Sequence, residues 1–330
     1  MNESESPSDE SIPSNNSATD VDYVAHVDLS TAGQECETLT EEHLGRPRRR
    51  FRLPIILFLL TCASTFWAGI TNWQPVPSFS LFRHLALQNG MQGFIYMACV
   101  LAILFAHEMG HFIATIVHRI PASPPFFIPF PFSPLGTMGA VIAMDGRQAD
   151  RKEIFDIGLA GPLAGLVFAI PILIFGIMKL KLNGVSYGET YDCPLLAEWL
   201  IRWIHPDAVH VDTISNYQLN PYFMAGWVGL FITGLNMMPV SQLDGGHVIY
   251  TLFLKKAHIV ARGFIFLAIM FIVFADAQVW TVMVVLVILM GTDHPKTKND
   301  NVPLGLPRTI LGLCSLAIPI LCFPPKLMDM

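Results

Sequence analysis

Apolar segments long enough to cross a lipid bilayer recur along this chain, and they restrict its fold more than any other feature. A helix needs about 20 consecutive apolar residues to span the hydrocarbon core. Of the 330 residues, 52% are hydrophobic and only 14% are charged, and the mean hydropathy is +0.49. This composition excludes an ordinary soluble domain. Candidate spans cover approximately Leu53–Thr71, Gly93–His118, Ile154–Met178, Tyr222–Tyr250, Gly263–Gly291 and Thr309–Phe323.

We therefore predict an all-α polytopic membrane protein with about six to seven transmembrane helices. The count depends on the run from Gly263 to Gly291, which Asp276 and Gln278 divide into either a hairpin of two short spans or one kinked helix. Between the second and third spans, Pro121 to Pro134 is too rich in proline for a regular helix. The next segment, Leu135 to Met144, is predicted to form a small re-entrant or β element.

The first 50 residues differ in composition from the rest of the chain. They are acidic and rich in Ser, Asn and Thr, and they end in an arginine cluster between Arg46 and Arg52. We predict that residues 1–50 form a disordered tail and that residues 51–330 form the membrane-embedded domain. Basic residues beside a first span stay in the cytoplasm, so we expect a cytoplasmic N-terminus. We also expect the protein to lie in a bacterial plasma membrane. The net charge of −6 predicts no nucleic-acid partner.

The second span contains the sequence HEMGH, from His107 to His111. Residues four apart lie on one face of a helix, so both imidazoles can reach one Zn²⁺, while Glu108 can act as general base on a water molecule. Ionisable side chains at this depth are costly unless they face a cavity and find partners. The motif therefore predicts a functional site. Core histidines bound to neighbouring helices, or an ion or proton pathway, remain alternatives.

Catalytic zinc generally takes three protein ligands, so a third ligand is needed from elsewhere in the chain. The span from Tyr222 to Tyr250 is interrupted by Pro239 and by two glycines, and Asp244 immediately precedes those glycines. Counted from the expected outer ends of their spans, His107 and Asn236 lie at similar depth, about 21 Å in. We predict that Asp244 joins the two histidines. A helix cap at the break is the alternative role for Asp244.

Together, FAHEMGH in one membrane helix and NMMPVSQLDGG in a later one resemble the site-2 protease family of intramembrane zinc metalloproteases. The resemblance covers roughly Leu53 to Gly246. The segment GTDHP, from Gly291 to Pro295, is similar to the chloroplast and cyanobacterial branch. Family members often carry Asn-Pro-x-Pro before the LDG motif, and here Met237 stands in place of the first of those prolines.

The resemblance implies that residues 51–330 are a zinc metalloendopeptidase domain. His107, His111 and Asp244 would bind one Zn²⁺ per chain, Glu108 would activate water, and Asn236 would contact the substrate or the oxyanion. It also implies regulated intramembrane proteolysis, with hydrolysis of transmembrane protein substrates within or next to the lipid bilayer, after trimming by an upstream site-1-type protease. A metal-binding membrane transporter and a non-cleaving, helix-binding pseudoprotease are the alternative functions.

Three further features accompany the motifs. Leu135 to Met144 matches the position where family members hold an unwound substrate by strand pairing, although a packing hairpin is the plainer interpretation. His247 is either a hydrogen-bond partner near the zinc or a core histidine. The segment Leu195–Ile204 combines Leu, Trp and a few charges, which predicts a helix lying in the membrane interface.

Overall fold

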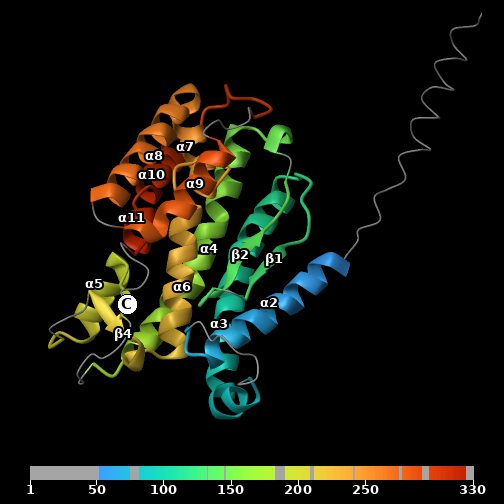
Figure 1. The fold of residues 1–330 in the computed structure, drawn as a ribbon. Coiled ribbons are helices and arrows are strands. Elements are labelled where there is room, and N and C mark those ends of the chain that lie inside the picture. Colours follow the sequence, from blue (N-terminus) through green and yellow to red (C-terminus); the bar gives the residue numbers. More distant parts are fainter. Residues whose placement is uncertain are drawn as a thin grey trace, which may run out of the picture. The chain divides into compact units, whose positions relative to one another are not determined.

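A computed structural model describes residues 52–74, 82–131, 133–144, 146–182, 190–208, 212–240, 242–274, 277–291 and 297–324 (Figure 1). The predicted acidic tail, residues 1–50, lies outside the described residues, as does most of the GTDHP segment. The described part of the chain is mostly helical, in agreement with the predicted class, and it also contains two small two-stranded sheets.

Three of the predicted spans are present as long helices. They are α2 (Arg52–Ile70), α3 (Phe82–Val117) and α4 (Arg151–Met178). Two of these, α2 and α4, are close to their expected bounds, whereas α3 begins eleven residues before the predicted start at Gly93. In α4, the Asp150 side chain accepts the backbone N–H groups of Lys152 and Glu153, and Glu153 reaches back to the N–H of Asp150. This capping box fixes where α4 begins, one turn before the apolar run.

A fourth helical run is long and apolar enough to cross a membrane, and its position differs from the expectation. It consists of α7 (Asp244–Phe253), the short helix η4 (Leu254–Lys256) and α8 (Ala257–Phe274). We expected Lys255 and Lys256 to end a span, whereas the chain continues through them with only a kink at Leu254, whose φ is +50°. Four candidate spans are therefore found among the described residues, and the expected count of six to seven is not confirmed.

The remaining C-terminal helices are shorter. They are η5 (Gln278–Trp280), α9 (Thr281–Met290), α10 (Leu306–Ser315) and α11 (Ile318–Cys322). The division between α8 and α9 falls near Asp276 and Gln278, where the sequence predicted a division of this apolar run. Arg308 on α10 makes two hydrogen bonds to the Asp156 carboxylate on α4, at 2.8 and 2.9 Å, which joins the last helices to the third span.

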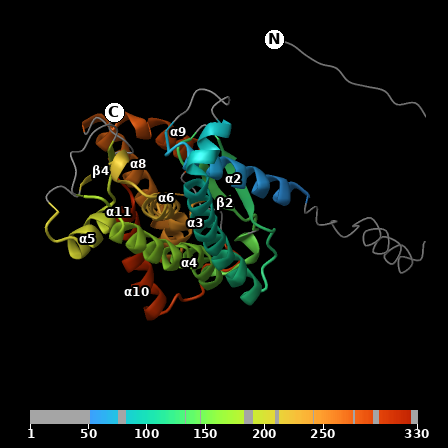
Figure 2. The same ribbon diagram turned by 90° about the horizontal axis from the view of Figure 1, so that it is seen from below.

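Helix α6 (Pro221–Asn236) forms the centre of the membrane domain. Figure 2 shows it in the interior, with α3, α4 and α11 around it. Asn220 caps the first turn by accepting the N–H of Phe223 at 3.0 Å, and Pro221 takes the first helical position. Close approach to α4 depends on Gly226, where a Cβ would lie 2.6 Å from the Cβ of Leu173.

A β-hairpin stands between α3 and α4, where the sequence predicted a small re-entrant or β element. Its second strand falls within the predicted segment, Leu135 to Met144, whereas its first strand falls in the proline-rich segment before it, where no strand was predicted. Strand β1 (Phe126–Phe130) pairs antiparallel with β2 (Gly136–Val141), with an irregularity between Ile128 and Pro129 that accommodates the proline. The hairpin packs on α2 and α3, beside which it lies in Figure 1. The Tyr96 hydroxyl on α3 donates to the carbonyl of Leu135 at 2.9 Å and so fixes the hairpin turn.

A second small sheet and a short helix lie between α4 and α6. The helix, α5 (Leu195–Ile204), has the bounds predicted from the sequence, with Ala197 and Ile201 buried while Trp199 and Trp203 are exposed. This pattern is the one expected for a helix in the membrane interface. The sheet of β3 (Thr190–Asp192) and β4 (Thr213–Ser215) was not predicted; its strands of three residues are too short to show an alternating pattern.

Candidate metal centre

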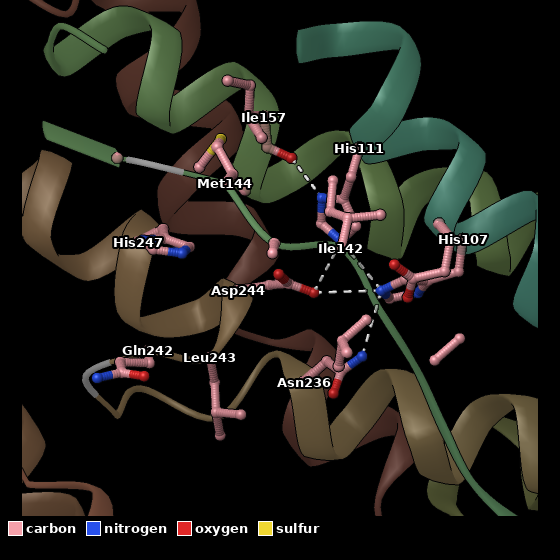
Figure 3. A pocket seen from close by; sticks show the side chains of 16 residues that line it. His107, His111, Ile142, Met144, Ile157, Asn236, Gln242, Leu243, Asp244 and His247 are labelled. Atoms are coloured by element: carbon pink, nitrogen blue, oxygen red, sulfur yellow. Dashed lines mark hydrogen bonds and ion pairs between the residues drawn. The ribbon is translucent and has the colours of Figure 1, made fainter. Parts of the chain in front are cut away.

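Three side chains that the sequence predicted to meet do converge in the structure. The Nε2 atoms of His107 and His111 lie 3.2 Å apart, and Oδ2 of Asp244 is 3.2 Å from the first and 3.3 Å from the second (Figure 3). Both histidines come from α3, one helical turn apart, whereas Asp244 is the first residue of α7 and lies 137 positions after His107. Both histidines are buried.

The spacing of these atoms fits a tetrahedral metal ion. Zinc binds nitrogen and oxygen ligands at about 2.0–2.2 Å, so two ligands of a tetrahedral site lie about 3.3 Å apart. The three measured separations of 3.2 to 3.3 Å match this value. Two imidazoles and one carboxylate are also a ligand set that zinc accepts. Among the described residues, this is the group of His, Cys, Asp and Glu side chains able to hold a metal.

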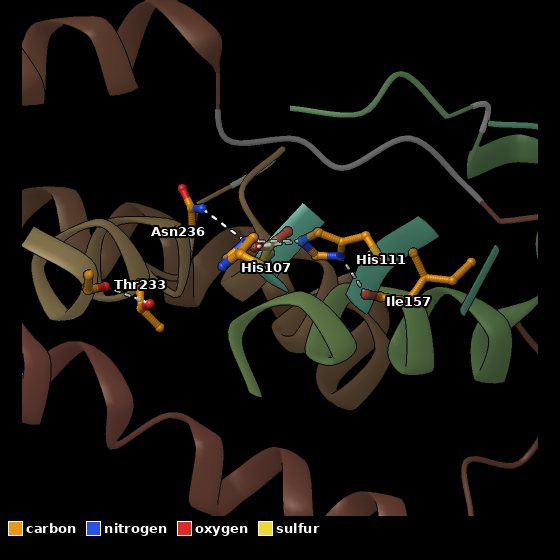
Figure 4. A network of polar contacts seen from close by, with 7 residues as sticks. His107, His111, Ile157, Thr233 and Asn236 are labelled. Atoms are coloured by element: carbon orange, nitrogen blue, oxygen red, sulfur yellow. Dashed lines mark hydrogen bonds and ion pairs between the residues drawn. The ribbon is translucent and has the colours of Figure 1, made fainter. Parts of the chain in front are cut away.

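A backbone carbonyl orients the second histidine. Nδ1 of His111 lies 2.7 Å from the carbonyl oxygen of Ile157 on α4, as Figure 4 shows. A carbonyl accepts only, so Nδ1 carries the proton and Nε2 of the neutral ring presents a lone pair toward His107 and Asp244. Such a partner on the far nitrogen is typical of histidines that bind metals.

Glycines on α4 make room for both imidazole rings. A Cβ on Gly161 would come closer than 3.0 Å to Nε2, Cδ2 and Cε1 of His111, and a Cβ on Gly165 would lie 3.1 Å from Nδ1 of His107. The two helix backbones also touch, since a Cβ on Gly110 would lie 2.5 Å from the carbonyl oxygen of Ala160. The sequence alone did not show that the ring atoms of the motif fill the space beside these glycines.

The position of Asp244 depends on the break between α6 and α7. Helix α6 ends at Asn236 and α7 begins at Asp244, so the chain leaves the helix even though Met237 replaces a family proline. A Cβ on Gly245 would collide with the carbonyl group of Met237, so only glycine fits at the second position of α7. The glycine thus brings the first turn of α7 against the break and directs the Asp244 carboxylate toward α3.

Glu108 and Asn236 complete the polar surroundings. Glu108 is buried, with 3% of its surface exposed, and its Oε2 has no hydrogen-bond partner among the described residues. A buried oxygen without a partner is unfavourable unless a water or a ligand supplies the missing donor. Nδ2 of Asn236 lies 3.2 Å from Nε2 of His107 and is therefore next to the three atoms that could bind the metal.

The donors open into a cavity of about 380 Å³. One wall is the end of the hairpin, from Ala140 on β2 to Met144, and the opposite side is the break and first turns of α7. Here the structure adds residues that sequence reasoning did not assign to the site. Gln242 and Leu243 line the cavity, and His247, whose role the sequence left open, also faces it one turn after Asp244 (Figure 3).

This geometry defines a class of protein. It is a helical membrane protein in which two buried histidines and a carboxylate are arranged to bind one metal ion. Residues 95–275 match the model of Peptidase family M50, which covers more than half of the chain. The chain therefore belongs to peptidase family M50. This confirms the family that the HEMGH and LDGG motifs indicated, and the zinc cofactor expected for it.

Several relatives are plant proteins that are named as chloroplastic zinc metalloproteases. The chain is 37% identical over 166 residues to the probable chloroplastic zinc metalloprotease EGY1 of Oryza sativa subsp. japonica, an alignment covering 48% of this chain and 28% of the relative. It is 30% identical over 229 residues to EGY1 of Arabidopsis thaliana, covering 63% and 41%. With EGY2 of Arabidopsis thaliana it shares 27% over 229 residues, covering 68% and 40%. The alignments span less than half the length of each of these relatives.

Proposed function

We propose that this protein is an intramembrane zinc endopeptidase that hydrolyses peptide bonds within or next to transmembrane segments of other proteins. The observation that carries the proposal is the convergence of His107, His111 and Asp244 at tetrahedral spacing. Beside them lies Glu108, whose buried Oε2 has no hydrogen-bond partner among the described residues. A zinc ion held by the three donors would supply a Lewis acid that acidifies water and polarises the scissile carbonyl.

The chain's own side chains divide the remaining work. Glu108 accepts a proton from the attacking water and so acts as a general base. The protonated Glu108 then acts as a general acid and passes that proton to the leaving amine. Its burial beside the metal-binding atoms suits this role, as does the absence of a hydrogen-bond partner for its Oε2 in the described part of the chain. The amide of Asn236 donates a hydrogen bond where negative charge develops on the scissile carbonyl oxygen.

The substrate must reach these groups in an extended form, because a helix hides its carbonyl groups in hydrogen bonds. We propose that the segment from Ala140 to Met144, which lines the cavity, pairs with the unwound substrate as an added strand. This assigns the hairpin a role beyond packing on α2 and α3. An upstream, site-1-type protease that trims the substrate first also remains a proposal.

The membrane arrangement has finer features that we propose on the same basis. Together with the four candidate spans, the helix α6, the helix α9 and the stretch formed by α10 and α11 complete about six to seven passes. The acidic tail, residues 1–50, lies on the cytoplasmic side, as the arginine cluster at its end favours. The chloroplast relatives do not test the bacterial plasma membrane that we expected, and it remains a proposal.

A metal transporter is the rival function that the same donors permit. A transport site needs ligands along a continuous path and has no requirement for a base, whereas an endopeptidase needs Glu108. The buried Oε2 of Glu108 lies beside the metal-binding atoms and has no partner among the residues that the structure describes, which favours the peptidase.

The test is cleavage of single-span model substrates by the purified full chain in proteoliposomes, with the zinc content measured on the same samples. Glu108→Gln keeps the shape of the side chain and removes the base, so we expect wild-type zinc and cleavage slowed by at least about 100-fold. Glu198→Gln, a partly buried acid on α5 away from the cavity, is the matched control and should cleave normally. Full cleavage by Glu108→Gln would refute the assignment, and metal without cleavage in the wild type would favour the transporter or a non-cleaving relative.

A further inference from the structure

A second cavity, of about 430 Å³, lies where α3 ends and α4 begins. We call it the basic cavity. Three separate segments of the chain form it: the end of α3, the approach to α4 with its first turn, and the loop that precedes α10. The lining residues are His118, Arg119, Ile120, Arg147, Gln148, Glu153 and Lys298.

Positive charge dominates the basic cavity. Three of its side chains are permanent cations, and Glu153 is the one carboxylate in the lining. That carboxylate already accepts the backbone N–H of Asp150 at 2.8 Å as part of the capping box. The side chains of Arg119 and Lys298 have no polar partner among the described residues, whereas Arg147 already has one. Cations gathered in one hollow repel one another, so the arrangement favours an anion between them.

The backbone at Arg119 is also unusual for an arginine. Helix α3 ends in a Schellman-type turn, in which the N–H of Ile120 bonds to the carbonyl of Thr115 at 2.9 Å. The residue inside this turn adopts the left-handed conformation that glycine prefers, and here it is Arg119, with φ of +58°. The chain thus keeps a cation at the rim of the cavity at a position where a residue without a side chain would fit the backbone better.

The position of the basic cavity indicates the source of the anion. It lies where the candidate span α3 ends and the candidate span α4 begins, and from this we infer that it lies at the level of the lipid headgroups. The loop that carries Lys298 is held there, because the N–H of Lys298 donates to the carbonyl of Ala149 at 2.9 Å. Basic pockets between membrane helices are known to hold phosphorylated headgroups.

We propose that the basic cavity binds a phosphate group, and that the phosphate belongs to an anionic phospholipid headgroup. A guanidinium group can donate two parallel hydrogen bonds to two oxygens of one phosphate, and a lysine ammonium group adds a point charge. The chemistry of the lining therefore matches this ligand. The site is separate from the metal donors and does not rest on the proposed peptidase activity.

The experiment is native mass spectrometry of the purified full chain in detergent, titrated with phosphatidylglycerol, with phosphatidylcholine or with inorganic phosphate. We expect one phosphatidylglycerol per chain, bound at least about tenfold more tightly than phosphatidylcholine, whose headgroup carries no net charge. Arg119→Gly suits the left-handed backbone and removes the charge, so it should fold normally and bind the anionic lipid about tenfold more weakly. Lys255→Gln, an exposed lysine outside the cavity, is the matched control.

Two outcomes would overturn the proposal. Wild-type binding of phosphatidylglycerol by both Arg119→Gly and Lys298→Gln would show that the basic cavity does not hold the lipid. Binding of inorganic phosphate as tight as that of phosphatidylglycerol, with both lost in Arg119→Gly, would identify free phosphate rather than lipid as the ligand.

Discussion

Replacement of Gly161 by alanine tests whether the glycines of α4 determine the metal site. The new Cβ would lie closer than 3.0 Å to three ring atoms of His111, and ordinary contact requires at least 3.4 Å, so the ring must retreat by about 0.4 Å or more. A metal site tolerates a change of only about 0.2 Å in its metal–ligand distances. The ring is also held on its other side by the Ile157 carbonyl, so it cannot move without losing that bond.

We therefore expect zinc affinity to fall by at least about 100-fold in Gly161→Ala, the upper range for changes that disturb ligand orientation. A competition titration of the purified chain with a zinc chelator measures this, and elution on size exclusion reports folding. Gly263→Ala on α8 is the matched control, because nothing lies within 4 Å of the Cβ that it adds. Wild-type zinc affinity in a folded Gly161→Ala variant would refute the reasoning.

Three further predictions follow from the same geometry. Asn236→Ala should lower kcat by about 100-fold while the zinc content stays near that of the wild type, which steady-state kinetics and metal analysis check together; an effect on KM alone would contradict the oxyanion role. Asp244→Ala should contain less than one zinc per chain when its metal content is measured by mass spectrometry. If the variant retained one tightly held zinc per chain, Asp244 would not be a ligand. Gly110→Ala should lower both thermal stability and zinc affinity, since its Cβ would lie 2.5 Å from the Ala160 carbonyl; an unchanged melting temperature would show that α3 and α4 are not in contact there.

Much of the helical arrangement could be predicted because hydrophobic length is a local property. The bounds of α2 and α4 agree with the predicted spans to within three residues, and α5 agrees at both ends. The continuation of α7 into α8 could not be predicted in this way. Lys255 and Lys256 suggested the end of a span, and only the packed structure shows that the helix resumes after the kink at Leu254.

The metal donors were predicted by two different kinds of inference. The pairing of His107 with His111 follows from helix periodicity alone, since residues four apart share a face. The participation of Asp244 rested on family resemblance and on counted depth, because no local rule relates residues 137 positions apart. The structure brings the three atoms together, and the fit of Gly245 against the Met237 carbonyl explains how.

The sequence by itself determined a membrane-embedded helical chain, a histidine pair on one helix face, and a broken helix with a carboxylate at the break. Only the tertiary structure decided that the glycines of α4 make room for the histidine rings and that cations from distant segments line the basic cavity. It also decided that one oxygen of Glu108 has no partner within the described ranges. The reason is physical: periodicity and hydropathy act between neighbours in the chain, whereas these features depend on which surfaces fit closely enough to pack.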